Sequence, residues 1–495
     1  MSETQPLELD PGTPEIDLSQ VKHRSALGIL ALTSRTFLIQ LISLAATFIL
    51  TVYLDPAVYG VFFLVSSVVN FLAYFSDIGL AAALIQKRGA LTREDLVTTF
   101  TIQQLLVLTL LLILFLLSPL IRSWYQISTP GLYLLYALGL SLFLSSLKTI
   151  PSVILERNIR FEKLIIPQIA ETLVFNLTAV YLAVKGFGLT TFTVAVLARG
   201  ITGLIIMYLI SPWQIGLGIS RNAFTSLLKF GLPYQLNTFL AMVKDDGLTI
   251  FLGKVIGPIG LGYIGWASRW ANMPLRLFLD NVTKVAFPAF SRLQHDRTRL
   301  KNMVEVSLKY LALFIFPLLT GMAVLALPTV NLIPRYAKWL PALVPLYLYL
   351  INAAFASVST LLTNLLSAVG RIKTTFKLMV MWTGLTWMLM PVLAINFGYL
   401  GVSIGAAVIA FSSIAVFIIA KRLVGLSLLA SLKTPIIVSI ALGLFLLLSR
   451  SLIDSLTSLS FIILGGASVS GLFLYLLEGK SFFANLLNYF KAKNA

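Results

Sequence analysis

Long apolar stretches dominate the pattern of hydrophobic and polar positions along the chain. Segments with no Asp, Glu, Lys or Arg include residues 97–121, 339–370 and 378–420. Each exceeds the roughly 20 residues that a helix needs to cross the hydrocarbon core of a bilayer. Leu108–Leu117 is apolar apart from Thr109, whereas a strand of a membrane barrel alternates apolar and polar residues. The pattern therefore predicts an all-α polytopic membrane protein.

Breaks at Pro, Gly and charge clusters divide the apolar stretches into about 14 predicted transmembrane helices. They lie near residues 35–53, 57–79, 97–118, 131–150, 164–184, 189–210, 224–252, 258–281, 303–326, 340–366, 375–396, 399–420, 434–450 and 459–477. The seventh and eighth spans are less apolar than the others, so twelve or thirteen spans remain alternatives.

A weak internal repeat organises these spans. Leu54-Asp55-Pro56 and Gly60 align with Ile256-Gly257-Pro258 and Gly262, an offset of about 202 residues. Six spans separate the copies, and six is even, so the sequence predicts two six-helix lobes as parallel repeats plus two C-terminal helices. The predicted regions are a disordered acidic cytoplasmic tail (1–24), an N-terminal lobe (25–210), a C-terminal lobe (211–423), two additional helices (424–480) and a cytoplasmic tail (481–495).

Composition supports a membrane location and explains the charge. The chain of 495 residues is 58% hydrophobic and 11% charged, against about 25% charged residues in soluble proteins, and its mean hydropathy is +0.93. Positive residues concentrate on the cytoplasmic side of membrane proteins. With the N-terminus inside, 25 Lys and Arg fall in inner segments and 6 in outer loops. Both termini are therefore predicted to be cytoplasmic, and the net charge of +18 requires no nucleic acid partner.

Two kinds of chemistry are not expected. The chain has no cysteine and two histidines far apart, His23 and His295, which argues against a metal site. Glu478-Gly479-Lys480-Ser481 resembles part of a phosphate-binding loop but has Leu474 in place of the first glycine. No cofactor is predicted. The basic segment 284–301 is expected to contact anionic membrane lipids.

Polar groups inside the predicted spans mark candidate functional positions, because an ionisable group in a membrane usually faces a cavity or a partner. In span eight, Arg269, Asn272, Arg276 and Asp280 recur at spacings that place them on one helical face. Span seven carries Asn237, Lys244, Asp245 and Asp246, and span six carries Arg199. A water-filled cavity between the lobes would accommodate these groups.

Two interpretations of these charges stay open. In the first, Lys244, Arg269 and Arg276 bind an anionic head group, with Asn272, Asn237 and Arg199 also lining the cavity. Asp245 or Asp246 would then carry a coupling proton or cation. In the second, Lys244 pairs with an aspartate and Arg276 pairs with Asp280 one turn away. Arg269 has no Asp or Glu within four residues of sequence, which favours the first interpretation for it.

Several motifs resemble a known family. Tyr59-Gly60-Val61-Phe62 and the stretch from Asp77-Ile78-Gly79-Leu80 to Ile85-Gln86 resemble the second span of bacterial polysaccharide flippases of the multidrug/oligosaccharidyl-lipid/polysaccharide exporter superfamily. Further matching features are Gly262-Tyr263 with Ala267 and Arg269, Lys338-Trp339, and Ala368-Val369-Gly370-Arg371. The resemblance covers about residues 25–480.

The resemblance implies two six-helix lobes around a central cavity that Arg269 and Lys244 would face. It also implies transport of polyprenyl-pyrophosphate-linked oligosaccharide by alternating access across the bacterial cytoplasmic membrane, for exopolysaccharide biosynthesis, with a polysaccharide polymerase complex as an expected partner. One alternative is a drug or cation antiporter of the same superfamily, for which an acidic cavity would be expected. The other is a membrane glycan polymerase or ligase, for which a longer outer loop than residues 327–339 would be expected.

Overall fold

The computed structural model describes residues 39–87 and 89–492, and all the regular secondary structure within them is helical. Side chains of residues 230, 232–234, 236–238 and 480–492 lie outside the described part, as does the predicted tail 1–24. The chain forms two compact units, residues 1–258 and 259–495. The prediction of an all-α polytopic membrane protein is confirmed, whereas the predicted lobe boundary at residues 210 and 211 stays a prediction.

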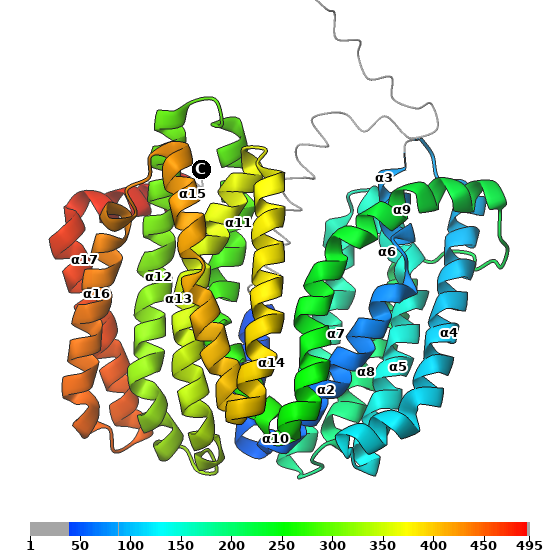
Figure 1. The fold of residues 1–495 in the computed structure, drawn as a ribbon, viewed down its shortest axis with the longest axis horizontal. Coiled ribbons are helices and arrows are strands. Elements are labelled where there is room, and N and C mark those ends of the chain that lie inside the picture. Colours follow the sequence, from blue (N-terminus) through cyan, green and yellow to red (C-terminus); the bar gives the residue numbers. More distant parts are fainter. Residues whose placement is uncertain (1–38, 88, 493–495) are drawn as a thin grey trace, which may run out of the picture. The chain divides into compact units, whose positions relative to one another are not determined.

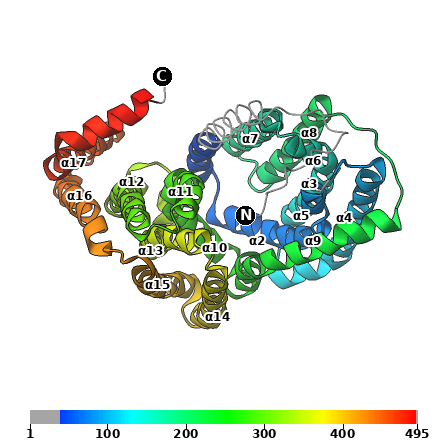
Figure 2. The ribbon, with the colours of Figure 1, turned by 90° about the horizontal axis from the view of Figure 1, so that it is seen from above.

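The first unit is built from short and long helices (Figure 1). In chain order they are Ile39–Tyr53, α2 (Pro56–Ala73), η1 (Tyr74–Ser76), α3 (Leu80–Gln86), α4 (Arg93–Tyr125), α5 (Thr129–Leu147), α6 (Thr149–Arg157), α7 (Phe161–Val184), α8 (Thr190–Ile210), α9 (Arg221–Met242), the π-helix η2 (Val243–Gly247) and the start of α10 (Leu248–Ala271). Helices α7 and α8 lie side by side, and α5 packs against α8 (Figure 2).

The second unit continues from the remainder of α10. Its elements are the π-helix η3 (Leu275–Leu279), α11 (Asp280–Arg292), α12 (Arg297–Leu332), η4 (Ala337–Ala342), α13 (Leu343–Ala368), α14 (Ile372–Phe411), α15 (Ile414–Val424), α16 (Leu428–Ser449), η5 (Arg450–Leu452) and α17 (Leu456–Ala492). Helix α12 packs along α16, α13 packs along α14, and α17 packs on α16.

Within the described residues, 11 helices are long and apolar enough to cross a membrane. Parts of the predicted spans seven and eight lie in one of them, Phe239–Ala271, and spans eleven and twelve lie in another, Ile372–Val424. The first predicted span is the shorter apolar helix Ile39–Tyr53. The count of fourteen therefore stays a prediction.

A glycine kinks each of the two long helices, α10 and α14, that contain two predicted spans. Gly257 has φ 67° and ψ 177°, and Gly398 has φ 59° and ψ −140°, so each interrupts the helical backbone inside α10 or α14. A residue with a side chain is strained in such a conformation, whereas glycine is not. Pro258 follows the first break and supplies no amide hydrogen to the preceding turn. The predicted boundaries near these glycines thus coincide with kinks.

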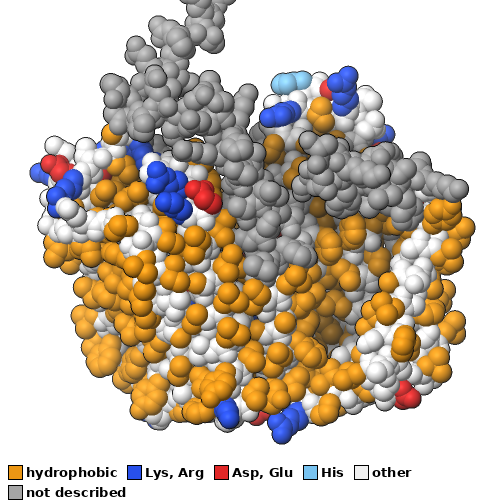
Figure 3. Space-filling view, turned by 180° about the vertical axis from the view of Figure 1, so that it is seen from behind, with side chains coloured by type: hydrophobic (Ala, Val, Ile, Leu, Met, Phe, Trp, Pro, Cys, Tyr) orange, Lys and Arg blue, Asp and Glu red, His pale blue; other side chains and the backbone are white. Residues whose placement is uncertain are grey.

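The outer surfaces of the helices are apolar. In α4, Leu112, Phe115 and Leu116 are 58%, 61% and 66% exposed, and a polar solvent would disfavour such a surface. Figure 3 shows apolar side chains covering the flanks between charged groups at the two ends. The chain is a multi-pass membrane protein whose lipid-facing surface consists of these side chains.

Candidate functional site

The π-helix η2 in the first unit connects to the polar face of α2. Asp246 accepts side-chain hydrogen bonds from Ser67 and Asn70 of that helix. A π-helix inserts an extra residue into one turn, and such insertions occur frequently at functional sites. Asp245 and Asp246 have different surroundings, because adjacent residues of a helix point in different directions.

Lys244 and Asp245 form an ion pair within the same turn. The Asp245 side chain is 66% exposed and that of Lys244 is 30% exposed. The geometry favours the second interpretation of Lys244, in which an aspartate neutralises its charge. Asn237 belongs to helical backbone in α9, but its side chain lies outside the described part of the chain.

A close contact joins the end of α2 and the start of α3 to α9. The Tyr74 hydroxyl donates to the Gln235 backbone carbonyl, and the Gln235 side-chain amide donates to the Tyr74 backbone carbonyl. Gly79 and Gly231 touch through their backbones, so a Cβ on Gly79 would overlap Gly231. Ile78 has a positive φ of 43°, which is unusual for a β-branched residue. The Asp77-Ile78-Gly79 motif is therefore the point where α3 meets α9.

Arg199 lies in an ion cluster between α7 and α8. Its Nε lies 3.5 Å from Glu171 Oε2, and the second oxygen of Glu171 pairs with the Lys148 amino group. The Arg199 side chain is 54% exposed, whereas those of Glu171 and Lys148 are each 13% exposed. The structure thus adds a partner to a residue that the sequence treated as a separate cavity group.

In the second unit, Arg269, Asn272 and Arg276 follow one another along the path from α10 into η3. The Asn272 backbone N–H donates to the Ser268 backbone carbonyl at 3.0 Å, and the Arg276 backbone N–H donates to the Asn272 backbone carbonyl at 3.2 Å. This α-helical bonding keeps the three side chains on one face. Arg269 and Arg276 are exposed, and Asn272 is half-buried.

Asp280 follows directly after the π-helix Leu275–Leu279, which contains Arg276. No ion pair joins Arg276 to Asp280, both of which lie in the described part of the chain. The pairing that the spacing suggested is thus not formed.

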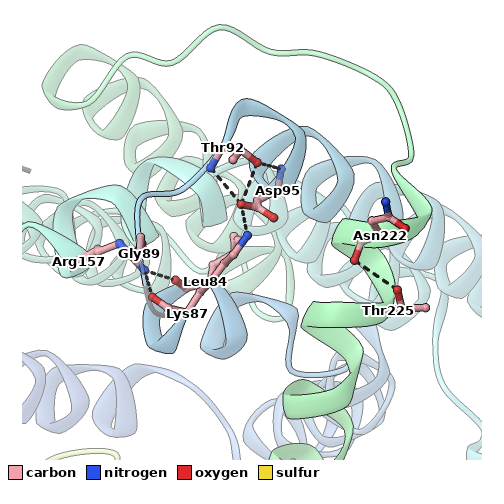
Figure 4. A network of polar contacts seen from close by, with 8 residues as sticks. All are labelled: Leu84, Lys87, Gly89, Thr92, Asp95, Arg157, Asn222 and Thr225. Carbon is pink, nitrogen blue, oxygen red and sulfur yellow. Dashed lines mark hydrogen bonds and ion pairs between the residues drawn. The ribbon is translucent and has the colours of Figure 1, made fainter. Parts of the chain in front are cut away.

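Charged groups at one end of the first unit form a structural network (Figure 4). Arg157 donates to the carbonyls of Leu84 and Lys87, each at 2.8 Å, and to that of Gly89. Lys87 forms an ion pair of 2.6 Å with Asp95, whose carboxylate also accepts from the Thr92 amide and hydroxyl. The loops that meet here were both predicted to be cytoplasmic.

Glu156 lies beside this network at the end of α6. Burial raises the pKa of the Glu156 carboxyl, and a hydrogen bond from Ser152 offsets part of that effect. The charged form of a half-buried carboxylate is less well solvated than in water, which is the cause of the shift. Glu156 is therefore a candidate for pH-dependent stability at this end of the unit.

Sequence reasoning missed Lys148 as an intramembrane charge. Although Lys148 falls within the predicted span 131–150, it was counted among the cytoplasmic positive residues, whereas the helical path continues from α5 into α6 across it. Its amino group instead lies beside Glu171, the eleventh of 24 residues in α7. Hydropathy predicts where the apolar stretch ends. It does not predict that the helical path continues beyond that end.

No cluster of three or more His, Cys, Asp or Glu side chains that could hold a metal ion occurs within the described residues. The polar groups above are instead arginines, lysines, amides, hydroxyls and isolated carboxylates. Such a set can bind phosphate through charge-assisted hydrogen bonds and sugar hydroxyls through amides.

A family model described as polysaccharide biosynthesis protein matches residues 49–344. The succinoglycan biosynthesis transport protein ExoT of Rhizobium meliloti is 22% identical over 316 residues, which cover 64% of this chain and 63% of ExoT. The lipopolysaccharide biosynthesis protein WzxC of Escherichia coli K12 is 24% identical, and the alignment covers 75% of this chain and 78% of WzxC.

Solved membrane transporters share the fold. The lipid II flippase MurJ in an inward closed conformation superposes with a TM-score of 0.73 at 17% identity, covering 92% of this chain and 99% of MurJ. An inward-facing multidrug resistance MATE family transporter of the MOP superfamily has a TM-score of 0.60 at 16% identity, covering 82% of this chain and 99% of the transporter. At these identities the likeness concerns the fold.

Proposed function

Because this chain belongs to the polysaccharide biosynthesis protein family, we propose that it is a flippase for lipid-linked oligosaccharide. Its substrate would be an oligosaccharide carried on polyprenyl pyrophosphate, moved from the inner to the outer leaflet of the bacterial cytoplasmic membrane. The family match and the MurJ-like fold confirm the resemblance inferred from the sequence motifs. The chain spans 63% of ExoT, so its substrate is part of the proposal.

The observation that carries the proposal is the polar face formed by Arg269, Asn272 and Arg276. Arg269 and Arg276 are exposed on a helical path within an apolar protein, where an arginine in contact with hydrocarbon would cost about 2.5–3.5 kcal/mol on insertion scales. A guanidinium binds a phosphate through two parallel hydrogen bonds. The amide of Asn272 offers both a donor and an acceptor to a sugar hydroxyl.

The proposed mechanism is alternating access without a catalytic step. The charged and hydroxylated head group would move past polar side chains while the polyprenyl tail stays in the bilayer. Both termini would be cytoplasmic, the 284–301 segment would contact membrane lipids, and a polysaccharide polymerase complex would receive the product. Asp246 is the stronger candidate for coupling, because Asp245 is paired with Lys244 whereas Asp246 joins η2 to α2.

The direct test uses a bacterial strain that carries this chain as its only flippase for a lipid-linked oligosaccharide. Arg269→Ala should reduce export by about tenfold or more, because a charged hydrogen bond contributes about 1.5–3 kcal/mol. Arg269→Lys should retain part of the activity, since a point charge replaces a bidentate group. The measurement is the fraction of lipid-linked oligosaccharide that an externally added glycosidase can cleave.

Arg299→Ala is the matched control, because Arg299 is 77% exposed and pairs locally with Asp296. It should export at the wild-type rate. Full export by a normally expressed Arg269→Ala protein would remove Arg269 from the head-group site. Export of small organic cations with no glycan transport would support the antiporter alternative instead.

Coupling is tested with Asp245→Asn and Asp246→Asn. An amide can still hydrogen-bond to Ser67 and Asn70 but carries no charge, so Asp246→Asn should fold and lose any dependence of export on a pH gradient. Asp245→Asn should keep that dependence. Wild-type dependence in the double variant would exclude both aspartates from coupling.

A further inference from the structure

The cluster of Lys148, Glu171 and Arg199 is an ionic site inside the first unit. Glu171 is the eleventh of 24 residues in α7, and Arg199 is the tenth of 21 residues in α8, so both lie near the middle of their helices. Lys148 reaches the same depth from the junction of α5 and α6. Charged groups are expensive at this depth and are retained where they face a partner or water.

The packing of α7 on α8 is shaped around the Glu171 carboxylate. A Cβ placed on Gly203 would overlap this carboxylate, so the absence of a side chain on α8 creates the space that Glu171 occupies. Gly203 follows Arg199 by one helical turn, which places the space and the guanidinium on the same side of α8. The carboxylate therefore lies in a position prepared for a group of its size and charge.

The charges of the cluster do not balance. Two cations surround one carboxylate, which leaves one positive charge. Arg199 uses Nε toward Glu171, while its side chain remains 54% exposed. Its terminal amino groups make no hydrogen bond with the described residues. A second anion can therefore approach the exposed end of the guanidinium.

A buried acceptor lies beside the cluster. The side-chain oxygen of Gln168, one turn before Glu171 on α7, is shielded from solvent and has no hydrogen-bond partner within the described residues. A buried polar atom without a partner is destabilising.

We propose that Glu171 is an internal counter-ion whose place is taken by a phosphate group of the substrate, which pairs with Arg199 and Lys148 in its stead. This inference rests on the proposed function in one respect, the anionic lipid-linked substrate. A diphosphate bears more than one negative charge and pairs with arginine bidentately, so it competes with a single carboxylate. On release of the substrate, Glu171 returns to the two cations and favours dissociation.

The proposal predicts opposite signs for two variants of the same ion pair. With the full chain purified in detergent and farnesyl pyrophosphate as the probe, Glu171→Gln should bind the probe about three- to tenfold more tightly, because a competing charge is removed. Arg199→Ala should bind it about tenfold or more weakly. Glu478→Gln, which removes the carboxylate paired with Lys309 at 2.5 Å in the second unit, is the matched control and should bind like the wild type.

A second pair of variants tests the position of the carboxylate without changing its charge. Gly203→Ala should displace Glu171 and strengthen probe binding in the same direction as Glu171→Gln. Gly200→Ala, one turn earlier on α8, meets only side chains at 3.0 Å or more and should bind like the wild type. These two variants keep the proposal testable if Glu171→Gln does not fold.

Three outcomes would overturn the inference. One is weaker binding in both Glu171→Gln and Arg199→Ala. Another is unchanged binding with reduced thermal stability in both, which would make the cluster a structural ion pair. The third is the same order of variants for the binding of phosphatidylglycerol in mixed detergent micelles, which would indicate a general anionic-lipid site. If the diphosphate is the recognised group, the affinities of the variants for inorganic pyrophosphate should rank in the same order as their affinities for farnesyl pyrophosphate. Their affinities for farnesol, which has no phosphate, should not rank in this order.

The cellular export assay separates this inference from the proposed function. Glu171→Gln should slow export despite tighter binding, since the substrate leaves the site more slowly. If the wild-type chain exports no lipid-linked oligosaccharide but the purified variants follow the predicted order, the proposed function fails and the anion site stands. Export by the wild type with no effect of these variants on binding would refute the counter-ion role alone.

Discussion

Arg157 shows how one side chain can hold a loop against a bundle. Its guanidinium donates to three carbonyls at the end of α3 and in the following loop, where helical carbonyls have no intrahelical partner. A cation at a helix C-terminus also interacts favourably with the helix dipole. Sequence analysis predicted Arg157 only as one of several cytoplasmic positive charges.

Arg157→Ala should therefore lower the free energy of unfolding by about 2 kcal/mol, the scale of hydrogen bonds to a charged group. Arg160→Ala is the control in the same loop, because the exposed Arg160 side chain makes no hydrogen bond or ion pair within the described residues. Thermal unfolding of both variants in the same detergent would measure the difference. Equal stability of the two variants would contradict this role of Arg157.

Glu156 should make stability depend on pH. Burial raises its pKa in the folded chain, so the folded state binds the proton more tightly than the unfolded state. Stability from this group is greatest below the ordinary glutamate pKa and falls as pH rises from that value through the raised one. Glu156→Gln should be more stable than the wild type at pH 7 and equal to it near pH 4. An equal gain at both pH values would exclude titration as the cause.

At the scale of elements, the contact between α3 and α9 depends on two glycines that occur far apart in sequence. Gly79 has φ 79° and immediately precedes α3, and its backbone touches that of Gly231. Sequence analysis identified Gly79 as part of a stretch that resembles a family motif. The motif could not reveal Gly231 as its partner, because the contact arises only when α9 packs on α3.

Gly79→Ala should destabilise the chain more than Gly186→Ala. Gly186 has a similar φ of 82°, but a Cβ there would meet nothing within 4 Å. Gly186→Ala therefore measures backbone strain alone, about 1–2 kcal/mol, whereas Gly79→Ala adds the overlap with α9. The two free energies of unfolding, measured in one detergent, would be compared directly. Equal losses would show that the close approach contributes nothing.

The π-helices are the element-scale feature that periodicity did not predict. A spacing of 3, 4 and 4 assumes 3.6 residues per turn throughout, and η3 adds a residue before Asp280. The ion pair that this spacing suggested between Arg276 and Asp280 is not formed in the described part of the chain. The other π-helix, η2, contains both Asp245, which pairs with Lys244, and Asp246, which bonds to α2.

At the scale of the whole molecule, segments that are far apart in sequence and predicted to lie on the same side of the membrane meet within each unit. In the second unit, Arg297 donates to the Leu423 carbonyl, and the Ser427 amide donates to Glu305. In the first unit, Lys254 donates to the Trp124 carbonyl, which joins two loops predicted to face outward. This agreement supports the predicted alternation of loops and leaves the direction of insertion to experiment.

Insertion can be measured without removing any native cysteine, because the chain has none. A membrane-impermeant maleimide should label Phe187→Cys from the outside of spheroplasts, since Phe187 is 54% exposed in a predicted outer loop. His295→Cys, at an exposed turn before α12, should react only in inside-out vesicles. Labelling of His295→Cys in sealed spheroplasts would reverse the proposed topology.

The amino-acid sequence by itself determined the fold class, the approximate spans and the family. Hydrophobicity over some 20 residues is a local property that the bilayer selects directly, and the Asp77-Ile78-Gly79-Leu80 motif is contiguous. Only the tertiary structure decided which charges meet. Lys148 lies at the junction of α5 and α6, Glu171 in α7 and Arg199 in α8, and Asp246 reaches α2 from η2. Packing rather than spacing brings these groups within hydrogen-bonding distance. Pairs between neighbours in sequence, such as Lys244 with Asp245, can be anticipated from spacing, whereas pairs between helices depend on packing.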